Sequence, residues 1–312
     1  MAVQSTQWLK LVEAEYLRRY TPSGGSSIKF IVGDPAVSSD LRDRLSSYAR
    51  DNGFLSVAID GAAVRLHMVQ EVFFAVARAV DWERLAQERL EAAFKELRYT
   101  WPKPGSRVPL SEMSAANGVA ETLLLNNVDQ WLSKRVMHDA AMTSDFREAM
   151  TYLCRQRLEP EVSVASLPIL EWLRGELRAI GAVRPVPIGA KITRHKARSM
   201  LRSLCHWLAL GGHPGIVMTM DLSWLAERAA SPAGIRYTPS SILDAFEVLR
   251  QLIDETDRLE GVFLVVTAPP ALVDGDDVRR TIGQYPALKG RVSIDVQARQ
   301  HDNPLAPLVR LV

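Results

Sequence analysis

The most constraining feature of the sequence is a strand, a loop, a helix and a second strand that follow one another within residues 28–60. IKFIVG (28–33) is a short run of β-branched and aromatic residues, as in a buried strand. Residues 40–51 have apolar positions at helical spacing, and FLSVAID (54–60) is predicted as the second strand. Such a unit joins parallel strands through a right-handed crossover, so we expect an α/β fold.

The rest of the chain alternates between two hydrophobic periods. From about residue 65 to 177 the period is that of a helix, and an earlier helix is predicted over 6–20. The α/β pattern then resumes. The expected helices are 67–80, 81–97, 111–136, 144–157, 166–177, 194–210 and 238–259, and the later strands are IVMTMD (216–221), VFLVVTA (262–268) and RVSIDV (291–296).

These elements predict a parallel five-stranded sheet flanked by helices, with a large helical insert between the second and third strands. The expected domains are an N-terminal helix and linker (1–26), the first half of the α/β core (27–64), the insert (65–185) and the second half of the core (186–312). Because few residues follow the predicted fifth strand, we expect no helical lid after it.

Composition narrows the class of protein. The 312 residues are 47% apolar and 24% charged, which is typical of a globular chain with a sizeable core. A net charge of +2 gives no global attraction to nucleic acid or membrane. Neither the two cysteines nor the six histidines have metal-ligand spacing, so no metal site is expected. Without a leader or a membrane-length apolar run, a cytoplasmic location is expected.

The turn after the first strand stands where a phosphate-binding loop of the form G-x-x-x-x-G-K-[ST] would lie. Only the first glycine of that motif is present, and an ordinary strand-turn-helix with one glycine has the same appearance. The corresponding positions read Gly33, Asp34, Pro35, Ala36, Val37, Ser38, Ser39 and Asp40.

Each replacement removes a function of the motif. Ser38 adds a side chain where the backbone would approach phosphates, and Ser39 lacks the positive charge of the lysine. Asp40 stands where a hydroxyl would ligate Mg²⁺, and Asp34 adds a second negative charge. Repulsion between such a carboxylate and a phosphate about 4 Å away is on the order of a few kcal/mol. We therefore expect neither ATP nor Mg²⁺ to bind.

The later strands carry the remaining positions of such a site. The third strand ends in Asp221, as a Walker B strand does, but the next residue is Leu222 instead of a water-polarising glutamate. The fourth strand ends near Thr267, a candidate sensor residue. Arg291 is a candidate for an arginine-finger-like position.

Together these segments resemble the ATP-binding family of BREX phage-defence loci, the BrxD-like branch of AAA+ (ASCE) P-loop proteins. The segments that carry the resemblance are GGSSIKFIVGD (24–34), DNGFLSVAID (51–60), KARSMLRSLCHWLALGGHPGIVMTMDLSWL (196–225) and AFEVLRQLIDETDRLEGVFLVVTAPPAL (245–272). The resemblance implies an AAA+-like core and a place in a bacterial anti-phage complex. Ser38, Ser39, Asp40 and Leu222 depart from the family pattern.

Three functions are consistent with these residues. The first is a P-loop-like protein without catalytic residues that acts as a scaffold, regulator or partner of an active ATPase or nuclease of the same locus. The second is a nucleic-acid adaptor, which would use a basic stripe on and before the helix 194–210. The third is a protein with residual nucleotide affinity. The residues of the basic stripe are Lys191, Arg194, Lys196, Arg198 and Arg202.

Overall fold

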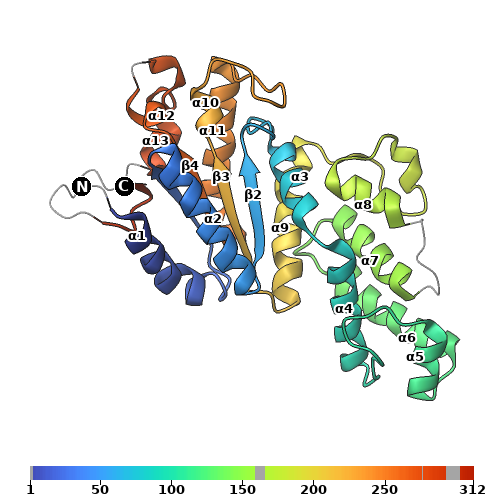
Figure 1. Ribbon diagram of the computed structural model, residues 1–312. Helices are drawn as coiled ribbons and strands as arrows, with labels where there is room; N and C mark the ends of the chain where they lie inside the picture. Colours follow the sequence, from blue (N-terminus) through green and yellow to red (C-terminus); the bar gives the residue numbers. More distant parts are fainter. Residues whose placement is uncertain (1–2, 159–165, 276, 293–302) are drawn as a thin grey trace. The chain divides into compact units, whose positions relative to one another are not determined.

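The computed structural model describes residues 3–158, 166–275, 277–292 and 303–312 (Figure 1). The chain forms two compact units. One consists of Met1–Ala79 with Leu208–Val312, and the other of Val80–Trp207. The domain boundaries proposed from the sequence stay predictions.

The first unit contains a five-stranded, all-parallel sheet that is flanked by helices (Figure 1). The strand order is β2-β3-β4-β1-β5, so β4 separates β1 from β3, which is consistent with a P-loop-like sheet. The sequence prediction of an α/β fold with a parallel sheet is therefore confirmed. The strands are β1 (Ser27–Val32), β2 (Leu55–Asp60), β3 (Ile216–Asp221), β4 (Val262–Ala268) and β5 (Leu308–Arg310).

Strands β3 and β4 are almost continuously apolar because both of their faces are covered. Every residue of β4 is buried, and in β3 only Asp221 is partly exposed. The two strands begin at a close approach of Gly215 and Gly261, where the Ile216 N–H donates to the Gly261 carbonyl at 2.7 Å. A Cβ on Gly215, which has a φ of +120°, would lie 2.1 Å from that carbonyl oxygen. Glycine is therefore required there.

The N-terminal helix and α2 share one hydrophobic core with the sheet. Helix α1 (Ser5–Val12) continues as a π-helix (Glu13–Tyr20), and α2 spans Pro35–Asp51. Leu41 and Leu45 of α2 are fully buried against Ile31 and Phe263 of the sheet. Val3 pairs with Leu311 beyond β5, which joins the two ends of the described chain at one edge. Replacing either leucine by alanine would cost about 2–5 kcal/mol.

The described elements between β2 and β3 are helical. They are α3 (Val69–Ala79), α4 (Trp82–Glu96), α5 (Leu110–Asn117), α6 (Glu121–Leu132), a π-helix (Ser133–Met137), α7 (Ser144–Leu158), α8 (Leu167–Arg174), a 3-10 turn (Ile180–Val183) and α9 (Arg194–Leu210). After β3 come α10 (Ser223–Ala226), α11 (Pro239–Asp254), α12 (Ala271–Asp274) and α13 (Pro286–Val292), with 3-10 turns at Thr256–Arg258, Val278–Arg280 and Ile282–Gln284.

Three sequence predictions are corrected by these bounds. Helix α2 begins at Pro35, five residues before the predicted start, because Asp34 takes the extended N-cap conformation and proline fits the first helical position. The helix predicted over 111–136 is broken at Gly118, which adopts a left-handed φ of 63°. The strand predicted over 291–296 is wrong at its first two residues, which end α13, and its other residues lie outside the described ranges.

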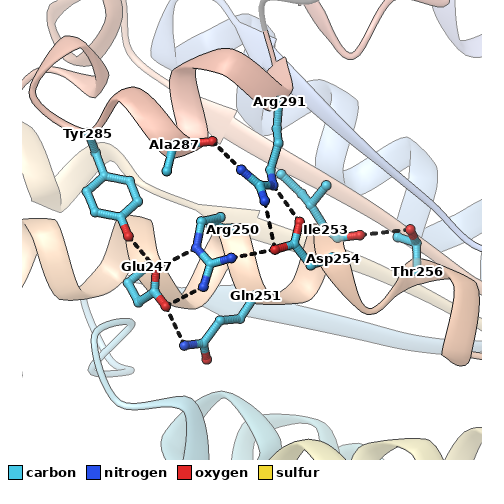
Figure 2. Close-up of polar contacts among 9 residues, drawn as sticks. All are labelled: Glu247, Arg250, Gln251, Ile253, Asp254, Thr256, Tyr285, Ala287 and Arg291. Carbon is cyan, nitrogen blue, oxygen red and sulfur yellow. Dashed lines mark hydrogen bonds and ion pairs between the residues drawn. The ribbon is translucent and has the colours of Figure 1, made fainter.

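A chain of alternating charges fastens α13 to α11 (Figure 2). The Glu247 carboxylate accepts hydrogen bonds from Arg250 at 2.6 and 2.7 Å, and from the Tyr285 hydroxyl. Arg250 also bonds to Asp254, which in turn accepts from Arg291. Hydrogen bonds from Arg250, and then from Tyr285 and Gln251, lower the pKa of Glu247 to about 2. These contacts, which we call the α11–α13 seam, thus hold α13 near both of its ends.

We predict that Glu247→Gln lowers stability in a pH-dependent way. The folded pKa of Glu247 lies below its ordinary value, so its contribution is present above about pH 4.5 and is lost as the pH falls through about 2. Because the side chain is about one-third exposed, we expect a loss of about 1 kcal/mol at pH 7. Urea unfolding from pH 7 to 2.5 measures this, and a wild-type–variant difference that does not shrink at acid pH would contradict it.

Candidate functional site

The carboxyl ends of β1, β3 and β4 meet at one edge of the sheet, which is where open α/β sheets bind ligands. Asp221 ends β3 directly opposite Thr267 of β4 in the parallel register. Gly33 follows β1, and its N–H lies 3.4 Å from the carbonyl of Ala268, the residue after Thr267. The sheet therefore brings Gly33, Asp221 and Thr267 together, although they are far apart in the sequence.

The predicted phosphate loop is largely helix. Only Gly33 and Asp34 lie between β1 and α2, so Ser38, Ser39 and Asp40 all belong to α2. Ser38 is buried, and Ser39 is exposed on the helix. Asp40 was expected at the start of the helix, but it lies inside α2. It forms an exposed ion pair with Arg44, one turn further on, at 2.9 Å.

Arg42 of α2 occupies the space between the two strand ends. Its Nη1 lies 3.0 Å from Asp221 Oδ2 and donates to Thr267 Oγ1 at 2.9 Å. The Arg42 side chain is 22% exposed and that of Asp221 is 17% exposed, so the pair is half-buried. Water screens such a pair less than a surface pair, and the attraction between the charges is correspondingly stronger.

Both Asp221 and Thr267 have hydrogen-bond partners within the chain. Asp221 Oδ1 accepts from the Ser223 N–H at 3.0 Å, while Oδ2 takes Arg42. The Thr267 hydroxyl accepts from Arg42 and donates to the Met220 carbonyl at 3.4 Å. Thr267 is almost fully buried, so an unpaired hydroxyl there would be costly. These contacts thus join the ends of β3 and β4 to helix α2.

Leu222 and the loop that follows it border the same edge. The Leu222 side chain is buried, and its N–H donates to the Thr267 carbonyl at 2.9 Å. Arg280 pins the loop by donating to the carbonyls of Leu225 and Glu227, at 2.9 and 2.7 Å, and of Tyr237, at 3.1 Å. This side of the edge is therefore also held by contacts within the chain.

The remaining candidate residues lie in other surroundings. The guanidinium of Arg291 bonds to Asp254 and to the Ala287 carbonyl, within the α11–α13 seam (Figure 2). Of the basic stripe, Lys196 is paired with Asp145, and Lys191 donates to the Arg178 carbonyl at 2.9 Å. Arg194 is exposed, whereas Arg198 and Arg202 are partly buried. The Asp221 carboxylate contacts Arg42 and the Ser223 N–H.

Comparison with known families decides the relationship. A family model described as "BREX system ATP-binding protein BrxC/D" matches residues 19–312. The chain belongs to this BREX family. A search of the curated proteins and a search of the solved structures gave no match. The resemblance seen in the sequence is confirmed at the level of the family, and the BrxD-like branch stays a prediction.

Two further observations describe the BREX-family chain. Within the described ranges, no helix is long and apolar enough to cross a bilayer. The same ranges hold no cluster of three or more histidine, cysteine, aspartate or glutamate side chains that could bind a metal ion.

Sequence reasoning missed Arg42, the residue that joins the site. On α2 it is one of several arginines, and Arg44 and Arg50 have the same appearance in the sequence. The one available signal was its position one residue after Leu41, next to the buried stripe of the helix. Such a position places a long side chain at the border of the core, where it can reach a neighbouring strand.

We predict that Arg42→Ala lowers the free energy of unfolding by about 2 kcal/mol, because it leaves the half-buried Asp221 without its charged partner. The matched control is Arg44→Ala on the same helix, which breaks an exposed pair with about half of each side chain in solvent. We expect the control to cost less than about 0.5 kcal/mol. Urea denaturation followed by circular dichroism measures both, and equal losses would show that Arg42 has no special role.

Proposed function

We propose that this chain is a component of a BREX defence system that does not hydrolyse ATP and acts through contacts with other components of the same locus. Family membership supports the place in a BREX system. The observation that carries the rest is the Arg42 guanidinium, which is bonded to both Asp221 and Thr267. A P-loop enzyme needs that space for its metal and nucleotide.

The loop region does not fit a triphosphate. With α2 beginning at Pro35, only Gly33 and Asp34 are available to wrap around phosphates, and Pro35 has no N–H to offer. A Cβ on Gly33 would lie 3.4 Å from the Leu311 carbonyl, so this glycine faces the chain's own backbone. Asp34 is exposed at the helix N-terminus, where its carboxylate opposes an anion. These features argue against a phosphate cradle.

The residues for hydrolysis are also missing. Ser39 supplies no cation for the β- and γ-phosphates, and its side chain projects from the helix instead of from a loop. Leu222 is buried and apolar at the position where a carboxylate would orient the attacking water. We therefore derive no catalytic step for this chain, despite the ATP binding in the description of its family.

A contact role fits a fold that is complete without a ligand. The groups that a nucleotide and metal would satisfy are already paired within the chain, so the sheet edge can keep its shape in their absence. We propose that the partners are proteins of the same locus, such as an active ATPase or a nuclease. For nucleic acid as the partner no observation adds support, because Lys191 and Lys196 already contact the chain itself.

We predict that purified protein neither hydrolyses ATP nor gains stability from it. Binding at 100 times the dissociation constant would stabilise the fold by about 2.7 kcal/mol and raise Tm by several degrees. We expect no such rise with millimolar ATP or ADP and Mg²⁺. The double variant Ser39→Lys with Asp40→Thr should also show none, because both positions lie in α2. A rise of several degrees for the wild type would refute the proposal.

The contact role has its own test. We expect tagged protein, co-expressed with the other proteins of its locus, to elute with at least one of them in size-exclusion chromatography. The contacts that this chain makes should persist in EDTA and without nucleotide. A gel shift at low ionic strength tests whether the chain binds nucleic acid. Elution of the chain alone from every pairwise co-expression would contradict the proposal.

A further inference from the structure

We infer that Arg42 fills a latent cation site, and that its removal opens a site for a divalent cation on Asp221 and Thr267. The inference deepens the proposed function and rests on it, since it gives a physical reason why this chain does not use a metal. The ligand class is a small divalent cation with oxygen ligands, such as Mg²⁺ or Mn²⁺.

One nitrogen of Arg42 contacts both oxygens of the latent site. Arg42 Nη1 lies 3.0 Å from a carboxylate oxygen of Asp221 and 2.9 Å from the hydroxyl oxygen of Thr267. The two oxygens come from directly opposed residues on neighbouring parallel strands, and the same Arg42 nitrogen reaches both. A positive centre held between a carboxylate and a hydroxyl oxygen is the setting in which Mg²⁺ binds, with waters completing its shell.

The tethered cation of Arg42 competes with a free cation for the same oxygens. Arg42 is attached to α2, whose Leu41 and Leu45 are fully buried, so its charge is delivered without loss of translational freedom. A free Mg²⁺ would have to shed tightly held water to displace it. Asp221 Oδ1 is meanwhile used by the Ser223 N–H, which leaves only Oδ2 for a cation. The guanidinium therefore excludes the metal.

The arrangement around Arg42 differs from an ordinary surface ion pair. Arg44 and Asp40 on the same helix also form an ion pair, at 2.9 Å, but each side chain is about half exposed. Asp40 is one turn away on the same helix, so that pair brings in no group from another element. Arg42 instead joins α2 to β3 and β4, and both of its partners are largely buried.

The test is a Mn²⁺ titration without nucleotide, read out by electron paramagnetic resonance of the free ion. We expect Arg42→Ala to bind one Mn²⁺ weakly, because the site offers few protein ligands. Wild type should bind at least about tenfold more weakly, which corresponds to about 1.4 kcal/mol. Mn²⁺ should also raise the Tm of Arg42→Ala and leave that of the wild type unchanged.

Two controls make the result specific. Arg44→Ala frees a single exposed carboxylate, Asp40, and should bind Mn²⁺ no better than the wild type. The double variant Arg42→Ala with Asp221→Asn should lose the gained site. Equal Mn²⁺ binding by Arg42→Ala and Arg44→Ala would overturn the inference, as would a gain that survives Asp221→Asn.

The inference can also be tested if Arg42→Ala fails to fold. If Arg42→Ala does not melt cooperatively, Arg42→Gln keeps the length of the side chain without its charge and is titrated in the same way. If both variants are unfolded in EDTA, recovery of the cooperative transition by Mn²⁺ supports the inference, and no recovery refutes it. ATP turnover by the wild type would count against the proposed function alone, because the titration contains no nucleotide.

Discussion

The parallel pairing of β4 between β1 and β3 is the constraint on which the rest of this structure depends. All of β4 is buried, so both of its faces must be covered and both of its edges must be paired. That pairing sets Asp221 opposite Thr267 and brings the turn after β1 to the same edge. The candidate site is therefore a consequence of the strand order, and the side chains at the edge decide its chemistry.

The Asp221 carboxylate at the end of β3 is largely removed from water. A half-buried charge needs a partner, because its removal from water is costly. In this chain α2 provides the partner from within, through Arg42, and the Thr267 hydroxyl completes the set. An internal cation makes the edge independent of what is dissolved around it. This independence fits the contact role that we propose for the chain.

The sequence predicted some elements to the residue and misplaced others, for physical reasons. The bounds of β3 and β4 were found because each is a continuous apolar run. The start of α11 was found because Thr238 caps it and Pro239 fits its first position. The same signal, Asp34 followed by Pro35, marks the start of α2, but the prediction followed the apolar positions from Leu41 onward and so gave a later start. Strand β5 has three residues and lacks a run long enough to be recognised.

The sequence by itself determined the parallel α/β sheet, the position of Asp221 and Thr267 near the ends of their strands, and the uncharged side chains of Ser39 and Leu222. These are local properties, set by hydrophobic runs and by which residue stands at which position. The tertiary structure alone decided what holds the edge together. Arg42 and Thr267 are 225 residues apart, and an arginine on an amphipathic helix has the same sequence pattern whether it is solvated or paired. Only the packing of α2 on the sheet distinguishes Arg42 from Arg44.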